Sequence, residues 1–242
     1  MDQPKRRRTL TLSVPALLVA LPMLFHYVPS LRSSVEAAPR TVAETPASPS
    51  HYAFLNLEPG STVPVRWSPC QPIHYVINPA GAPSNGVGIV KSAVADAQAA
   101  SGLRFTFDGL SDRTPLWHNG TSLNDLPEHA PVLIAWDTSS GDSDLKGDTA
   151  GIGEGTDWSI DGYEYYRSGG VTLDADAFRG LAGAPVGQQQ ERSIVLHELG
   201  HMLGLGHVKD ASQIMYPSTS GQIDYGSGDR NGLAILGHGP CG

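Results

Sequence analysis

The alternation of apolar and polar residues predicts a strand followed by a helix near the start of the folded region. Residues 73–77 (Ile-His-Tyr-Val-Ile) are β-branched or aromatic and lie between Pro72 and Pro79, a composition typical of a strand. From 86 to 101, valine and alanine recur at helical spacing, and Gly102 follows as a stop signal. We therefore expect a helix over 86–101.

The rest of the chain predicts several more strands and two more helices. Short apolar runs predict strands at 103–107, 132–136, 171–173 and, with the weakest pattern, 149–154. Helical spacing returns at 188–203 and, over a shorter length, at 229–236. An order of strand, helix, several strands and then helix indicates an α/β (α+β) fold in one domain.

The first 50 residues have a different pattern. Four basic residues at 5–8 precede an uncharged and largely apolar stretch at 9–31, and Val35-Glu36-Ala37 offers small residues for cleavage after Ala37. This order predicts a secretory signal peptide over 1–37. The alternative is an uncleaved membrane anchor, because the apolar run approaches the roughly 20 residues that span a bilayer. Either segment would leave the remainder outside the cytoplasm, secreted or membrane-anchored.

Composition divides the remainder into a tether and a folded domain. Residues 38–50 are mostly Pro, Ala, Ser and Thr with almost nothing apolar to bury, which predicts a flexible tether before a domain at 51–242. The chain has 16 Lys and Arg against 24 Asp and Glu, a formal net charge of −8. Because phosphate binding needs a basic footprint, we expect no nucleic-acid partner. Contact with a membrane is expected only through the N-terminal segment, if it is not cleaved.

The segment from 197 to 207 carries the clearest chemistry. His197 and His201 are four residues apart, so on a helix they present two imidazoles on one face. Glu198 lies beside the first and is placed to take a proton from metal-bound water. Gly204 lets the backbone leave the helix, so that the chain can deliver His207 as a third ligand. Three nitrogens and a water make an open tetrahedral site, which suits one catalytic Zn²⁺.

This HExxHxxGxxH pattern, with Met215 in the Ser-Gln-Ile-Met-Tyr-Pro stretch at 212–217, resembles the metzincin metalloproteases. The order GLGH and then IMYP is most similar to the matrixin branch (peptidase family M10). Small secreted bacterial matrixin-like peptidases share two further stretches, GGVTLD at 169–174 and the GDxxGLxxLG…GC ending at 228–242. The resemblance extends from about Trp67 to the C-terminus.

The resemblance implies a fold and a set of roles. The fold is a metzincin (zincin-like) catalytic domain, with a twisted mixed five-stranded sheet, an active-site helix, a Met-turn and a C-terminal helix. Its upper part would run to about residue 204 and its lower part over 205–242. His197, His201 and His207 would be the zinc ligands, Glu198 the general base and acid, and Met215 an apolar floor. An antiparallel edge strand near 149–154 would pair with an extended protein or peptide substrate.

The resulting hypothesis is an exported, monomeric zinc metalloendopeptidase that hydrolyses peptide bonds by Glu-assisted attack of zinc-bound water. One alternative is a proteolytically inactive, zinc-containing surface binding protein, against which the intact Glu198 argues. Another is a zinc hydrolase that acts on a non-peptide bond, which the Met-turn disfavours. The position two residues after the Met-turn proline is Thr219, where matrixins often have tyrosine, so the S1′ preference stays open.

Two further features of the sequence give weaker functional signals. Cys70 and Cys241 predict one disulfide in an exported chain, and the alternative is Cys70 as a thiolate ligand of zinc. Acidic residues are concentrated between 125 and 176. They predict either a solvated face or a Ca²⁺ site. The candidate calcium ligands are Asp142, Asp144 and Asp148, or Asp174 and Asp176, where the resemblance to matrixins implies a structural calcium after the strand.

Overall fold

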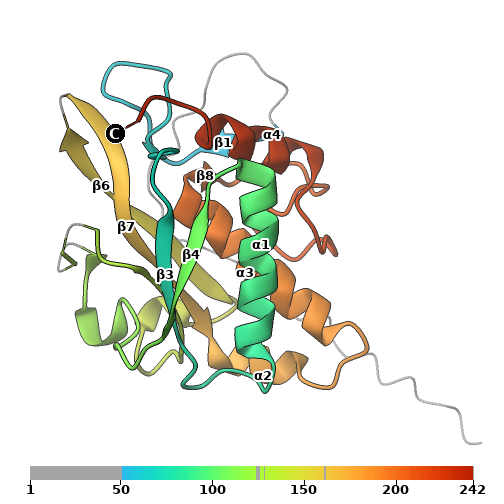
Figure 1. The fold of residues 1–242 in the computed structure, drawn as a ribbon. Helices are drawn as coiled ribbons and strands as arrows, with labels where there is room; N and C mark the ends of the chain where they lie inside the picture. The colour runs from blue at the N-terminus through green and yellow to red at the C-terminus, as the bar shows by residue number, and fades with distance from the viewer. Residues whose placement is uncertain (1–50, 124–125, 128, 161, 242) are drawn as a thin grey trace, which may run out of the picture. The chain divides into compact units, whose positions relative to one another are not determined.

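The structure is a computed structural model that describes residues 51–241 except 124–125, 128 and 161 (Figure 1). The predicted signal peptide or anchor at 1–37 and the tether at 38–50 lie outside the described residues. Within the described part of the chain, none of the helices has the length and apolar character needed to cross a membrane.

One mixed sheet forms the frame of the domain. Its five main strands are β3 (Ile73–Asn78), β4 (Phe105–Leu110), β5 (Val132–Asp137), β6 (Gly151–Ile160) and β7 (Tyr163–Asp174). They lie in the order β4-β3-β5-β7-β6, and all neighbours are parallel except β6 and β7. A short strand, β2 (Arg66–Trp67), adds parallel to the first half of β7. The mixed sheet implied by the resemblance is therefore confirmed, with an antiparallel strand at its edge; the short β2 is a sixth strand beyond the five expected.

Helices connect and cover these strands. They are α1 (Gly86–Ser101), α2 (Ala175–Leu181), α3 (Gly187–Leu203) and α4 (Ser227–Leu236), with single 3₁₀ turns η1 (His118–Gly120) and η3 (Ser143–Leu145). Helix α1 crosses between the parallel strands β3 and β4 and lies alongside α3, which also packs on β6 and β7 (Figure 1). The apolar faces of α1 and α3 are buried in one continuous core with the sheet.

Alternate glycines on β6 allow α3 to lie very close to the edge strand. A Cβ atom added to Gly153 would overlap the backbone carbonyl oxygen of Glu198, and one added to Gly151 would lie 2.7 Å from Glu198 Cγ. A side chain at either position would push the helix away from the sheet. The glycines therefore allow the short distance between α3 and the edge strand.

Two links join the first part of the domain to residues late in the chain. Strand β1 (Ala53–Phe54) pairs antiparallel with β8 (Leu205–Gly206), the two residues that follow Gly204. The structure also contains the predicted disulfide, which joins Cys70 to Cys241 across 171 residues. These two links fix residues near the start of the domain to residues near its end.

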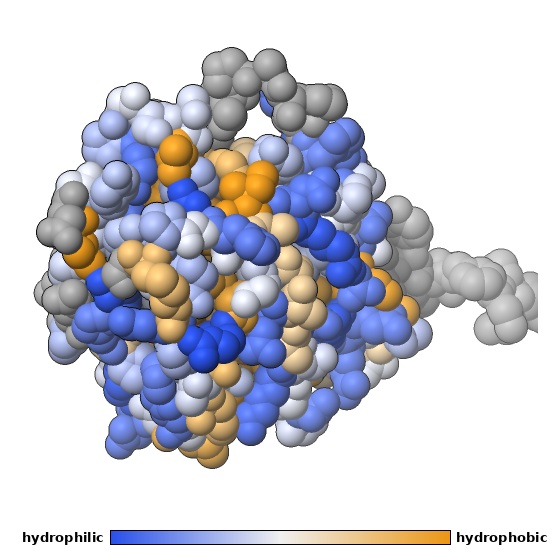
Figure 2. Space-filling model, turned by 45° about the horizontal axis from the view of Figure 1, so that its top comes forward, coloured by the Kyte–Doolittle hydropathy of each residue, from blue (hydrophilic) through white to orange (hydrophobic). Residues whose placement is uncertain are grey.

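The face drawn in Figure 2 mixes polar and apolar residues, and its apolar residues gather in small, separate patches. Among the described residues, the most exposed large apolar side chains are Leu110, Tyr163 and Val186, which come from three different elements. Scattered apolar residues of this kind are normal on a protein surface.

Candidate metal centre

The end of α3 brings three histidines together. His197 and His201 lie one helical turn apart, and α3 ends at Gly204, whose φ of 115° is in the left-handed region. Glycine adopts this conformation without the strain that a side chain would add, so the chain can turn into β8 and reach His207. The three Nε2 atoms are 3.0–3.1 Å apart in every pair. The three side chains with metal-ligand spacing thus meet at one point.

Backbone carbonyls set the orientation of two of these rings. His197 Nδ1 donates to the carbonyl oxygen of Ile214 at 2.7 Å, and His201 Nδ1 donates to that of Leu205 at 2.8 Å. With the proton on Nδ1, the lone pair of each ring is on Nε2 and faces the other histidines. The carbonyls therefore select the tautomer that can bind a metal.

Burial keeps the three rings neutral. His197 is 3% exposed and His201 1%. Burial, together with the nearby His207, lowers the pKa of His197 to about 3, and burial lowers the pKa of His207 to about 4. The pKa of His201 is also well below its ordinary value, with burial as the largest cause. Neutral imidazole is the form that ligates metals.

This donor set fits zinc. Tetrahedral zinc with Zn–N bonds of about 2.0–2.1 Å holds its nitrogens about 3.3–3.4 Å apart, within a few tenths of an ångström of the spacing here. Among the described residues, these histidines form the one group of three or more His, Cys, Asp or Glu side chains with ligand atoms close enough to share an ion. Three protein nitrogens leave a fourth position open, as in catalytic zinc sites.

Glu198 lies between α3 and the edge strand, next to His197 in the helix. The side chain is fully buried, and neither carboxylate oxygen has a hydrogen-bond partner in the described part of the chain. Burial raises its pKa well above the ordinary value. A buried carboxyl group without partners is unfavourable for folding alone, and such groups concentrate at functional sites.

The loop after His207 places Met215 against helix α3. The backbone N–H of Val208 donates to the carbonyl oxygen of Met215 at 3.0 Å, and the buried Met215 side chain lies against Gly200, between the two helical histidines. The Asp229 carboxylate accepts hydrogen bonds from the backbone N–H groups of Ile214, Met215 and Gly226. Asp229 was predicted only as the start of a helix, and its position in the sequence gives no signal of this contact.

The candidate calcium ligands have a different role in the structure. Asp174 caps α2, because its carboxylate accepts a hydrogen bond from the backbone N–H of Asp176 at 3.0 Å. Asp176 forms an ion pair with Arg179 one turn later. Neither belongs to the group of potential metal ligands found among the described residues. The calcium assignment is therefore not supported, since helix capping accounts for this acidic pair.

A small cavity of about 30 Å³ opens beside His197. It is lined by three residues of α3, among them Ile194, and by residues of the segment 214–222, among them Tyr216 and Thr219. The cavity therefore lies between His197 and the segment that contains Thr219, the position where matrixins often have tyrosine.

Comparison with known proteins agrees with the fold and the histidine centre. Residues 92–235 match the matrixin model of peptidase family M10, and the chain belongs to this family of zinc metallopeptidases. No curated protein sequence matches the chain.

Solved structures give distant likenesses. Archaemetzincin from Methanopyrus kandleri is 14% identical, with a TM-score of 0.46 over 66% of this chain and 92% of that one. Archaemetzincin from Archaeoglobus fulgidus, complexed with malonate, is 16% identical, with a TM-score of 0.41 over 66% and 99%. The GM1-bound form of the ECX AB5 holotoxin is 15% identical, with a TM-score of 0.39 over 70% and 81%.

Proposed function

We propose that this zinc metallopeptidase is an exported endopeptidase in which Glu198 is the general base and acid. The observation that carries the proposal is the convergence of three Nε2 atoms beside a buried carboxylate that has no partner among the described residues. His197, His201 and His207 would hold the zinc ion. Zinc, when bound, supplies a Lewis acid that polarises the scissile carbonyl and lowers the pKa of water.

Glu198 is suited to moving the proton. Burial raises the pKa of its carboxyl group, which makes the carboxylate a stronger proton acceptor than an exposed glutamate. Because neither oxygen is engaged with the described protein groups, both are free to bind the attacking water and then the leaving amine. Gly151, packed against the side chain, restricts where the carboxylate can lie.

The edge strand and the small cavity favour an extended peptide as substrate. Strand β6 pairs with β7 on one side and is an edge of the described sheet on the other, so its backbone can pair with another strand. The cavity of about 30 Å³ beside His197 would then take a small side chain next to the scissile bond. Substrates with small residues at this position should be cleaved best.

Export rests on two independent features. The basic and apolar pattern of residues 1–37 predicts a signal peptide or an anchor, and the domain at 51–242 contains a disulfide, which forms in oxidising compartments. The catalytic unit would then consist of an upper part to about 204 and a lower part over 205–242.

Peptide cleavage by zinc-loaded protein, measured with a quenched-fluorescent peptide library, tests the proposal. Glu198→Gln should lower kcat by about 10²–10⁴-fold while zinc content stays at one ion per chain. A chelator should abolish cleavage, and zinc should restore it. Cleavage that survives the substitution would contradict the role of Glu198. Zinc binding without cleavage of any peptide would favour a surface binding protein instead.

A further inference from the structure

A second glutamate of α3, Glu191, is largely buried and lies away from the metal centre. It is 3% exposed, its carboxylate borders a cavity, and among the described residues it has no hydrogen-bond or ion-pair partner. Burial raises its pKa. A largely buried carboxylate that borders a cavity and has no protein partner can act as the counter-charge of a cationic ligand.

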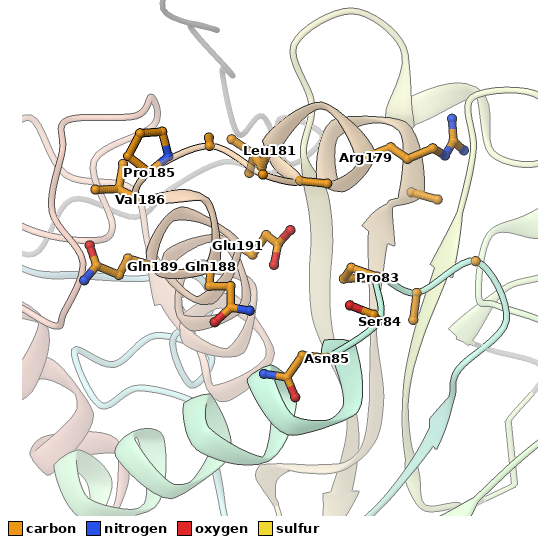
Figure 3. Close-up of a pocket in the computed structure, with 16 residues that line it drawn as sticks. Pro83, Ser84, Asn85, Arg179, Leu181, Pro185, Val186, Gln188, Gln189 and Glu191 are labelled. Atoms are coloured by element: carbon orange, nitrogen blue, oxygen red, sulfur yellow. The ribbon is translucent and has the colours of Figure 1, made fainter.

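Glu191 faces a cavity of about 620 Å³ between the start of α1, the end of α2 and the start of α3 (Figure 3). This volume lies within the range of small-molecule binding sites. Figure 3 shows the carboxylate directed into the space between α3 and the loop at Pro83 and Ser84. Glu191 lies six positions before His197, which places it about 9 Å away along the helix and on a different side. None of the lining residues belongs to the metal centre.

The residues around Glu191 provide hydrogen-bond acceptors and apolar surface. The Ser84 hydroxyl and the amides of Asn85 and Gln188 line the cavity with Glu191, while Leu181 and Pro185 contribute apolar surface. Asn85 makes no capping hydrogen bond to α1, so its amide is available to a ligand. This combination matches a ligand with several N–H donors on a short apolar arm.

The arginine side chains near the cavity already form ion pairs with other residues. Arg179, at the edge of the cavity, pairs with Asp176, and Arg192, next to Glu191 in the chain, pairs with Asp96 and Asp224. The N-termini of α1 and α3 also lie here and by themselves favour an anion. An anion, however, would share the cavity with the Glu191 carboxylate, and like charges repel. The net charge of −8 also attracts cations to the protein.

We propose that this cavity is a second binding site, which takes a guanidinium or ammonium group on a short alkyl arm with Glu191 as its counter-ion. The arm would pack along Leu181 and Pro185, and the cationic head would donate to Glu191 and the neighbouring amides. The same chemistry occurs on a free small molecule and on an arginine or lysine side chain of a polypeptide. The site does not depend on the proteolytic function.

Calorimetric titration with N-acetyl-arginine amide tests the site, and N-acetyl-citrulline amide is the uncharged isostere. The experiment uses the zinc-loaded full chain in a Glu198→Gln background, so that peptide cleavage has no part in the result. We expect the arginine ligand to bind at least about tenfold more tightly than the citrulline ligand. Glu191→Gln should remove this difference, whereas Asp112→Asn, which removes one exposed negative charge elsewhere, should keep it.

The melting temperature separates lost binding from lost folding. Because Glu191→Gln removes an unpaired buried charge, it should leave the melting temperature unchanged or raise it. Tighter binding of Gly-Gly-Arg-Gly-Gly than of the arginine amide would identify a polypeptide ligand, and the reverse order a free small molecule. No saturable binding, equal binding of arginine and citrulline, binding unaffected by Glu191→Gln, or preferential binding of phosphate would overturn the proposal.

Discussion

Asp229 and His197 both form hydrogen bonds with the backbone of Ile214. Asp229 Oδ2 accepts a hydrogen bond from the backbone N–H of Ile214 at 2.6 Å, and His197 Nδ1 donates to the carbonyl oxygen of Ile214 at 2.7 Å. Helix α4 therefore positions a candidate zinc ligand that lies 32 residues earlier in the chain, through one intervening peptide segment.

Asp229→Asn should lower the affinity for zinc by about 10–100-fold, the usual effect of losing a group that orients a ligand. Asparagine has one acceptor oxygen in place of two, and its NH₂ group would face a backbone N–H. Competition with a chromophoric chelator measures the affinity. Asp112→Asn is the matched control, because it removes an exposed charge outside α4. An unchanged affinity in folded Asp229→Asn protein would show that α4 does not orient His197.

Gly153→Ala and Gly151→Ala should have different effects. At 153 the new methyl group overlaps a backbone carbonyl, so we expect the free energy of unfolding to fall by about 2–4 kcal/mol. At 151 it meets the Glu198 side chain, so activity should fall more than stability does. Denaturant unfolding and kcat separate the two. Ser159→Ala, on the exposed part of β6, is the control for stability; equal effects of both glycine variants would contradict the packing described.

The pH dependence of stability should report on Asp210. Its carboxylate accepts hydrogen bonds from the backbone N–H and hydroxyl of Ser212 and from Gln213, and it contacts His51. These bonds, those of Ser212 first, hold the pKa of Asp210 well below its ordinary value of 3.8. A depressed carboxyl pKa stabilises the fold above the unfolded-state pKa, and the contribution is lost as the pH falls toward the folded-state pKa.

We therefore expect Asp210→Asn to melt at a lower temperature than the wild type at neutral pH. The difference should shrink as the pH is lowered below about 4. Thermal melts across this range provide the measurement, with Asp112→Asn as the control. A difference that stays constant down to about pH 3 would show that the carboxylate form of Asp210 is not what stabilises the loop.

Loss of the disulfide should destabilise the whole domain. Cys70 and Cys241 close a loop of 171 residues, and removal of such a link costs about 2–5 kcal/mol. Cys70→Ser with Cys241→Ser should lower the melting temperature and leave the stoichiometry of zinc at one. Since the histidines lie far from both cysteines in sequence, loss of zinc from the folded double variant would contradict a purely structural role.

The sequence predicted the elements whose local pattern is strong. The helix over 86–101 has the predicted bounds, and 188–203 lies within α3, because apolar residues at helical spacing face one core. The metal motif was recognisable because its spacing follows directly from helical geometry. The predicted edge strand at 149–154 corresponds to the first part of β6.

Features that depend on tertiary contact were not predictable. The hairpin of β6 and β7 is much longer than the apolar runs at 149–154 and 171–173, because its glycines and polar residues are held by pairing rather than by propensity. Helix α2 is short and begins at Asp174, whose capping role looks in sequence like a calcium ligand. The burial of Glu191 follows from which face of α3 meets α1, and spacing alone does not determine this.

The pairing of β1 with β8 has a consequence for how the domain is made. Residues 53–54 pair with the turn that leads to His207. Asp229 holds the neighbouring loop through hydrogen bonds from the backbone N–H groups of Ile214 and Met215. During synthesis, the first two histidines leave the ribosome before α4 does, and β1 has no partner until β8 follows. A complete three-nitrogen site therefore exists only after nearly the whole domain has emerged, so metal loading is expected to be a late, post-translational step.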